Sequence, residues 1–462
     1  MAVHSKLKAA LLAGSALAGM ALSSVTAQAG GFAVREQSAY FQGTSFAGAA
    51  AGGPSISSMF WNPATMTGAA PGLTTESAYT GIIGDSVITP TAAAHPAAPG
   101  LLGFGDSGNI SEKALVPASY IVWRPSEQWA LGIATGAPFG LVTNPRALWA
   151  GMFYSRESEV ITYNATPMAA YKVNNWLSVG AGLQVQYMRV RLDQAFPGSG
   201  TFPPFGPLAP DTLSINANGI SVGFTAGVTL TPTPWTTIGI GYRSGINQGL
   251  EGNALRPAFV ASVVPFPVVV PAGAATILAH LPLPDTVSLG IRQKVTESFT
   301  LLGTVEWANW SRFDAVPITL VPNPAPPGIP TALPFGWQDG WFASIGAEYQ
   351  FNPALALRAG IGFERSPITD AVRATRLPDN DRIWASAGVS YAWSEKLSID
   401  LGYTHIFVDD APINLSPGSG NPSFNPALGT FIGTARTDVD IISLGIRYRF
   451  GDFPLKPLVT KG

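Results

Sequence analysis

Side chains that could catalyse a reaction are few in this sequence. A lipid hydrolase needs a nucleophile with a base, and Ser221 lies in a G-x-S-x-G pattern, Gly219 to Gly223. That pattern requires a strand–turn–helix elbow, whereas here it lies inside one continuous strand pattern. His405, with Asp409 and Asp410 nearby, is the remaining base, and no group of residues has metal-ligand spacing. We therefore keep an outer-membrane lipid hydrolase only as a less favoured function for this protein. We expect no catalytic residue, metal or cofactor.

Charged side chains recur instead at alternate positions of apolar segments, where they share one face of a strand. Four arginines fall on this face: Arg243, Arg292, Arg358 and Arg447. The carboxylates placed in the same way are Glu306, Glu348, Glu364 and Asp400. Such arginines could bind the carboxylate of an organic acid. They could also pair with these carboxylates in a structural network, which is the commoner use of buried charges. The sequence leaves both alternatives open.

The segments that carry these charges alternate with a period of two, as strands with two unlike faces do. In the segment that ends at Phe450, apolar residues occupy one face and Ser, Gly and Arg the other. Several segments have the ~9–11 residues that a tilted membrane strand needs. Tight turns alternate with long loops, which is typical of outer-membrane barrels with an even number of strands. We therefore predict an all-β fold, a fourteen-stranded antiparallel transmembrane barrel. The predicted strands lie near 72–82, 116–124, 128–137, 159–173, 176–192, 213–230, 235–246, 286–295, 298–311, 337–351, 354–365, 381–393, 396–408 and 437–450.

The composition agrees with a surface that faces lipid. Charged residues make up 12% of the 462 residues and apolar ones 46%. A soluble domain usually carries about twice that charge. The net charge of -2 offers no basic face, so we expect no nucleic acid among the partners. The absence of Cys excludes a disulfide-rich scaffold.

The two ends of the chain indicate export to the bacterial outer membrane. Residues 1–29 have the basic start, the apolar core and the Ala27-Gln28-Ala29 cleavage site of a secretory signal peptide. The alternation that ends at Phe450 resembles the signal that the barrel assembly machinery recognises. Residues 451–462 then form a C-terminal tail, which we place in the periplasm. Outer-membrane lipid and the assembly machinery are the expected partners.

Residues 30–71 precede the first strand and do not alternate. They are rich in small and apolar residues, which favours burial over a solvated tail. Wide barrels are often blocked by an internal segment. We therefore expect a hatch, or plug, at 30–71 inside a barrel that spans 72–450.

Three kinds of short motif are spread over the chain after residue 29: Gly30-Gly31-Phe32, Phe60-Trp61-Asn62-Pro63-Ala64 and scattered segments such as Ala137-Pro138-Phe139-Gly140. Through these motifs the whole chain after residue 29 resembles the FadL-type outer-membrane transporters of long-chain fatty acids and aromatic hydrocarbons. The resemblance implies passive diffusion of a hydrophobic compound through a plugged barrel. It also implies sideways exit at a kink in the third strand, beside the hatch residues Asn62, Pro63 and Ala64.

Two features of this sequence bear on that mechanism. Gly132, Gly136 and Pro138 lie in or after the third strand, and Gly or Pro in a strand marks a bend or a broken ladder. Glycine is common in all these strands, so the residues alone do not decide whether the third strand is kinked. The outer groove of the family corresponds to loops at 194–212 and 247–285, which are unusually apolar.

The expected ligand residues combine these loops with the hatch and the inward cations. They are Phe32, Phe202, Phe205, Leu208, Phe259, Phe266, Arg243, Arg292 and Arg358. We expect the ligand to be a long-chain fatty acid or a related hydrocarbon. An aromatic hydrocarbon channel of the same fold is the alternative. An open porin for hydrophilic solutes is disfavoured by the apolar loops.

Overall fold

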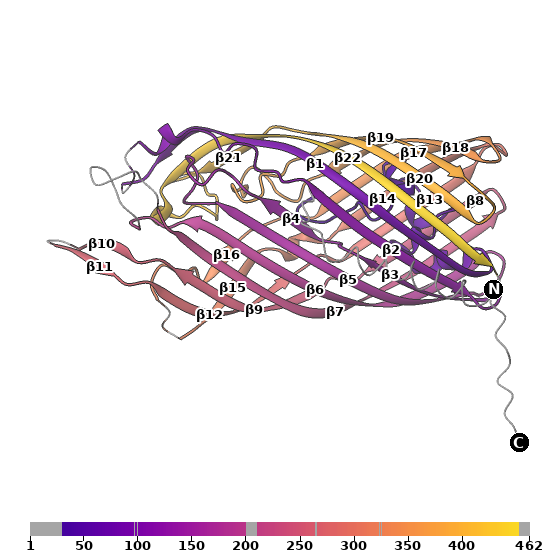
Figure 1. The fold of residues 1–462 in the computed structure, drawn as a ribbon, viewed down its shortest axis with the longest axis horizontal. Helices are drawn as coiled ribbons and strands as arrows, with labels where there is room; N and C mark the ends of the chain where they lie inside the picture. The colour runs from indigo at the N-terminus through magenta and orange to yellow at the C-terminus, as the bar shows by residue number, and fades with distance from the viewer. Residues whose placement is uncertain are drawn as a thin grey trace, which may run out of the picture.

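The computed structural model describes residues 30–96, 98, 100–199, 210–263, 266–322, 324 and 326–451. They form a closed barrel, because β1 (Gly72–Ala94) pairs with β2 (Ala114–Arg124) on one side and with β22 (Thr430–Gly451) on the other. All pairings are antiparallel, and the strands run obliquely around the long axis (Figure 1). The predicted fourteen-stranded antiparallel barrel is confirmed.

Several barrel strands are interrupted, so two labelled elements follow one another along a single strand of the wall. The interrupted strands of the wall are β3 (Trp129–Gly136) with β4 (Gly140–Thr143), β8 (Thr236–Arg243) with β9 (Asn247–Arg256), β12 (Gly273–Pro282) with β13 (Thr286–Lys294), β14 (Phe299–Ala308) with β15 (Ala315–Val321), and β20 (Leu397–Val408) with β21 (Ala411–Leu415). The other strands of the wall are β5 (Glu157–Lys172), β6 (Leu177–Ala195), β7 (Thr212–Thr233), β17 (Gly340–Asn352), β18 (Leu355–Arg365) and β19 (Arg382–Ala392). From β2 to β22 the strands follow one another around the ring in the order of the chain. The short elements outside the wall are β10 (Phe259–Val263), β11 (Phe266–Val270), β16 (Ala332–Pro334), η5 (Leu101–Phe104), η6 (Trp310–Arg312) and η7 (Pro426–Leu428).

The strands extend further on the loop side than the sequence predicts. Strand β1 continues to Ala94 and pairs with β22 over its whole length. The predicted loop at 247–285 is mostly strand, because β9 and β12 pair with each other beyond the expected end of the membrane strand. Its tip is the β10–β11 hairpin, which projects beyond the rim (Figure 1). Outside the bilayer no lipid selects for alternation, so the pattern that marks membrane strands gives little signal there.

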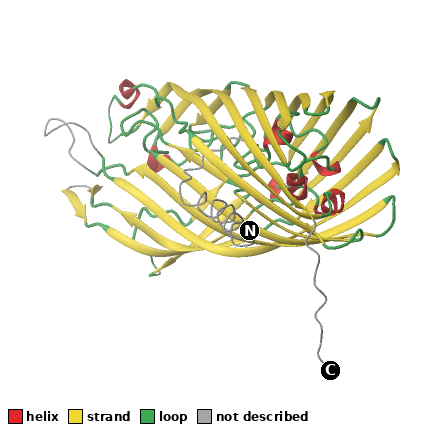
Figure 2. Ribbon diagram, turned by 45° about the vertical axis from the view of Figure 1, so that its right-hand side comes forward, coloured by secondary structure: helices red, strands yellow, loops and turns green. Residues whose placement is uncertain are grey.

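The hatch is folded inside the barrel as a series of single turns. These are α2 (Ala39–Gln42), η2 (Ala49–Ala51), η3 (Ile56–Phe60) and η4 (Pro63–Gly68), and most of their residues are fully buried. Figure 2 shows short helices enclosed by the strands. Among the described residues, no helix is long and apolar enough to cross a membrane.

The hatch approaches the wall so closely that inward-facing glycines are required. A Cβ on Gly239 would lie 1.8 Å from the backbone oxygen of Ala50, and one on Gly241 would lie 1.8 Å from that of Trp61. On β18, four strands further around the ring, a Cβ on Gly360 would lie 2.1 Å from the oxygen of Thr44. Many glycines on the inner face of the strands are therefore docking positions for the hatch backbone.

Candidate functional site

The third barrel strand is broken at the predicted position. Strand β3 ends at Gly136, β4 begins at Gly140, and Pro138 lies between them. The ladder between the second and third barrel strands stops at the Ser119–Thr135 pair. An isolated bridge between Ser111 and Thr143 follows, and no pairing joins β2 to β4 in the described part of the chain. The wall is thus interrupted between the Ser119–Thr135 pair and the Ser111–Thr143 bridge.

The start of the hatch is bonded to the broken strand. The amide of Val34 donates to the oxygen of Pro138 at 2.8 Å, and the amide of Gly140 donates to the oxygen of Phe32 at 2.9 Å. The side chain of Gln37 donates to the oxygen of Ala137 at 2.9 Å. The break is therefore covered from inside by residues 32–37, because they satisfy backbone groups that a neighbouring strand would otherwise satisfy.

The other predicted kink and hatch residues lie around this contact. A Cβ on Gly136 would lie 2.3 Å from the amide oxygen of Gln37, and one on Gly132 would lie 2.7 Å from the sulfur of Met66. Because neither glycine has a Cβ, the hatch can pack directly against β3. The hatch motif Asn62-Pro63-Ala64 forms its hydrogen bonds with other parts of the protein.

Asn62 connects two parts of the hatch to the wall. Its side-chain amide donates to Ala50 at 2.8 Å and to Val228 of β7 at 2.9 Å. Its oxygen accepts the amide of Ala64 at 3.0 Å and begins η4, with Pro63 at the first helical position. The motif is therefore an N-cap and an anchor to β7.

Phe32 is the centre of an aromatic cluster above the break. Its ring centroid lies 4.9 Å from that of Trp310, 5.5 Å from Phe313, 5.8 Å from Trp337 and 5.9 Å from Phe139. The edge-to-face geometry of the first three pairs is the preferred one for aromatic rings. Only 4% of Phe32 is exposed, and its ring packs on Trp310.

The cavity on the loop side is large and apolar. Its volume is about 700 Å³, and Phe32 forms part of its inner wall. Apolar lining residues include Leu141, Val160, Leu192, Phe196, Leu213 and Phe259. The predicted residue Phe259 therefore lies in this wall, where its ring is 5.1 Å from that of Phe196. An apolar pocket of this size suits a hydrophobic ligand.

Phe266 begins β11 in the projecting hairpin. Phe202, Phe205 and Leu208 lie outside the described residues.

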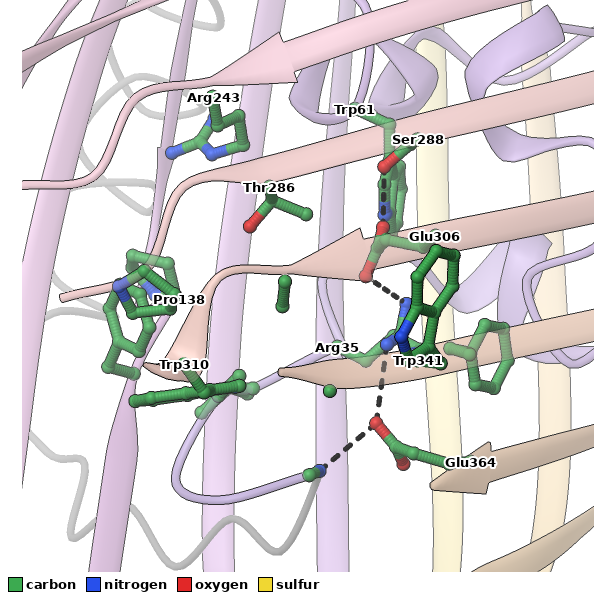
Figure 3. Close-up of a pocket in the computed structure, with 18 of the residues that line it drawn as sticks. Arg35, Trp61, Pro138, Arg243, Thr286, Ser288, Glu306, Trp310, Trp341 and Glu364 are labelled. Carbon is green, nitrogen blue, oxygen red and sulfur yellow. Dashed lines mark hydrogen bonds and ion pairs between the residues drawn. The ribbon is translucent and has the colours of Figure 1, made fainter. Parts of the chain in front are cut away.

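Trp310, whose ring packs on Phe32, lines a second pocket of about 80 Å³, which we call the polar pocket because Arg35, Arg243, Glu306 and Glu364 line it (Figure 3). Arg35 enters it from the hatch and bonds Glu306 at 2.7 Å and Glu364 at 3.3 Å. Ser288 donates to the second oxygen of Glu306 at 2.5 Å, and the backbone nitrogen of Gly30 bonds Glu364 at 3.0 Å. Pro138 lines the same pocket, so the pocket reaches the break in the wall.

The three predicted arginines differ in their partners. Arg292 bonds Glu348, and a terminal nitrogen of Arg358 lies 3.7 Å from Asp400. Arg243 instead donates to the oxygen of Phe60 at 3.1 Å and to the side-chain oxygen of Gln184. No carboxylate lies within ion-pair distance of Arg243 in the described residues, and Arg243 lines the polar pocket. It is therefore a cation with neutral partners in the polar pocket, next to the aromatic cluster that borders the apolar cavity.

Glu36, the hatch residue next to Arg35, is a candidate that is not among the predicted site residues. Only 1% of Glu36 is exposed, and neither carboxylate oxygen has a hydrogen-bond partner among the described residues. Burial raises the pKa of this hatch carboxyl to about 7. The sequence signal was the adjacent pair Arg35-Glu36, two charges in an otherwise apolar segment. The aromatic partners of Phe32 gave no comparable signal, because they come from three distant loops.

A closed barrel with an internal hatch, an apolar cavity and a lateral break defines a plugged outer-membrane transporter. A family model described as "Outer membrane protein transport protein (OMPP1/FadL/TodX)" matches residues 20–450. The chain belongs to this family, and it is an outer-membrane transporter of hydrophobic compounds.

Individual relatives agree with this assignment. The chain is 25% identical to the long-chain fatty acid transport protein of Salmonella typhi over 326 residues, which cover 68% of this chain and 74% of that protein. It is also 25% identical to that of Escherichia coli K12 over 334 residues, covering 67% and 74%.

Solved structures share the fold. A Pseudomonas aeruginosa FadL homologue superposes with a TM-score of 0.77 at 22% identity, covering 91% of this chain and 100% of that one. The Pseudomonas putida toluene transporter TodX superposes with a TM-score of 0.67 at 15% identity, covering 90% and 99%.

Proposed function

We propose that this transporter carries long-chain fatty acids rather than aromatic hydrocarbons. The observation that carries the proposal is Arg243, a lumen cation without a carboxylate partner in the described residues. A fatty acid would place its chain along the apolar cavity and its carboxylate against this guanidinium. A guanidinium binds a carboxylate through paired, charge-assisted hydrogen bonds, whereas toluene offers no acceptor.

The same arrangement supports a path for the ligand. A molecule that enters the cavity of about 700 Å³ meets Phe32, passes into the polar pocket when that ring moves, and meets Pro138 at the break. From there it leaves sideways into the membrane. In this proposal the driving force is the concentration gradient of the hydrophobic compound. We also propose that processing after Ala29 precedes this function.

The test compares ligands that differ in the head group alone. Oleate, oleyl alcohol and toluene are titrated into the purified barrel, wild type and Arg243→Gln. We expect the wild type to prefer oleate and Arg243→Gln to weaken oleate binding by about tenfold to a hundredfold, with oleyl alcohol unchanged. Arg189→Gln, at an exposed arginine paired with Glu159 at 2.6 Å, is the matched control.

Two results would contradict the proposal. One is equal binding of oleate and oleyl alcohol by the wild type. The other is binding of toluene without measurable binding of oleate, which would favour the aromatic hydrocarbon alternative.

A further inference from the structure

The outer surface of the barrel carries an apolar groove on the side away from the broken third strand. It crosses β13, β14, β17 and β18, about halfway around the ring from the gap beside β2, and has a volume of about 640 Å³. Gly303 and Ala343 are its smallest outward residues. Ile291, Val305, Ile345 and Phe363 stand around them.

The space above Gly303 is bounded by few atoms. A Cβ added there would meet only the Cγ2 of Ile291 at 3.1 Å and the oxygen of Ser344 at 3.9 Å. The neighbouring Ile345 is 67% exposed, so its side chain forms a ridge beside a depression. An apolar depression at this depth is covered by hydrocarbon chains in the membrane.

The next row of outward-facing residues on the loop side of the groove contains two tryptophans and an arginine. Trp307, Trp341 and Arg365 are consecutive cross-strand neighbours on β14, β17 and β18, and Trp341 is 48% exposed. Arg365 is the last of the 11 residues of β18, which begins at a short turn. At ~3.3 Å per residue and a tilt of ~40°, that length matches the ~25 Å apolar band of such barrels. Arg365 therefore lies at the outer membrane boundary, where Trp side chains favour the head-group level.

Arg365 is an exposed cation that forms no ion pair with any residue in the described ranges. The next residue in its row is Asp381, whose carboxylate accepts the amide of Ser366 at 2.8 Å. Arg189, by contrast, is paired with Glu159 at 2.6 Å. The guanidinium of Arg365 is thus available to an anion from the membrane, directly above an apolar groove.

We propose that this surface binds one molecule of lipid A, the phosphorylated and multiply acylated glycolipid of the outer leaflet. A phosphate of the lipid would accept paired hydrogen bonds from Arg365, and one acyl chain would lie over Gly303 and Ala343. Arginine matches phosphate geometry better than a point charge does. This lipid would lie on the outer surface of the barrel, whereas the transported compound passes through the lumen, where Trp341 and Arg365 also contribute to the lining of the polar pocket.

The test uses the full-length barrel, purified in detergent and examined by native mass spectrometry with bis-phosphorylated lipid A. We expect one lipid retained per wild-type barrel and about tenfold less retention by Arg365→Gln. Gly303→Leu, which fills the groove, should lower retention as well. Ala181→Leu, at an exposed position on β6, is the control and should match the wild type. Dephosphorylated lipid A should be lost from the wild type.

Retention that is unchanged in both Arg365→Gln and Gly303→Leu would overturn the proposal. So would equal retention of phosphatidylglycerol by the wild type, or a dimer that Gly303→Leu dissociates, since the groove would then be a general anion site or a protein interface. Folding is checked by the heat-dependent mobility of the barrel in gels. If Gly303→Leu does not fold, Ala343→Leu fills the same groove.

Discussion

The amide of Gly140, where the third barrel strand resumes, donates a hydrogen bond of 2.9 Å to the backbone oxygen of Phe32 at the start of the hatch. The same residue of the hatch thus bonds the broken strand through its backbone, while its ring lines the apolar cavity and packs on Trp310 of the polar pocket. Movement of Phe32 would therefore change the lumen and the lateral break together. This coupling makes Phe32 the first residue to test.

Replacing Phe32 by Ala should open the passage between the cavities. The lost ring contacts leave a void that joins the apolar cavity to the polar pocket, and burying a Phe contributes about 3–5 kcal/mol to packing. We expect a higher ion conductance in planar bilayers and faster entry of oleate into proteoliposomes.

Phe41→Ala is the matched control for this change. Phe41 is fully buried in the hatch, with its ring 5.9 Å from that of Trp61, and it lines neither of the two cavities. Equal conductance of the two variants would show that any loosening of the hatch opens the barrel, and that Phe32 has no special position.

The strands could be predicted because lipid imposes the pattern. Where one face meets hydrocarbon and the other the lumen, residues such as Leu444 and Gly445 must alternate, so strand positions and inward faces followed from the sequence. The continuation of β1 to Ala94 did not, because no bilayer constrains that part. The inner glycines looked like ordinary lumen residues. Their role depends on the hatch, whose path no local pattern specifies.

Gly239→Ala should displace the hatch from the wall. The added methyl would lie 1.8 Å from the oxygen of Ala50, and backbone on both sides prevents a local adjustment. Overpacking of this kind costs about 1–3 kcal/mol or more. We expect residues 30–71 to become sensitive to protease in the folded barrel. Gly81→Ala, where the nearest atom is the oxygen of Ile442 at 3.8 Å, should behave as the wild type, and protection of the hatch in both variants would refute this account.

Glu348→Gln should destabilise the protein more than Arg243→Gln. Glu348 bonds Arg292 and also accepts the hydroxyl of Tyr40, so its removal leaves a largely buried cation unpaired. Breaking a buried pair costs about 3–5 kcal/mol, whereas loss of hydrogen bonds to neutral partners costs about 1–3 kcal/mol. The temperature at which the compact form is lost in gels measures the difference, and the reverse order would contradict the assigned roles.

The sequence indicated which residues of the candidate site face the lumen, but not which of them contact one another. Strand parity indicated that Arg243, Arg292 and Arg358 face the lumen. Which of them lacks a carboxylate depends on neighbours such as Gln184, fixed by cross-strand register and by the hatch. Phe139 and Trp310 meet Phe32 only because the hatch folds back onto the broken strand. Phe202, Phe205 and Leu208 stay predictions.

The seating of the hatch should depend on pH through Glu36. Its pKa is about 7 in the folded protein and 4.5 for an ordinary Glu, so between these values the folded hatch holds a proton that an opened hatch releases. The stability of the seated hatch therefore falls as the pH rises from about 4.5 to about 7, by up to about 3 kcal/mol, and is level above that. Hydrogen exchange of the amides at 30–40, corrected for the chemical rate at each pH, should show more opening at pH 8 than at pH 5.

Glu36→Gln carries no charge at either pH, so its corrected exchange should be the same at both and should match the protonated wild type. The substitution keeps the size of the side chain, which separates the charge from the packing. A wild type without pH dependence would mean that the carboxylate has a partner when it ionises. A dependence that persists in Glu36→Gln would assign the titration to another group.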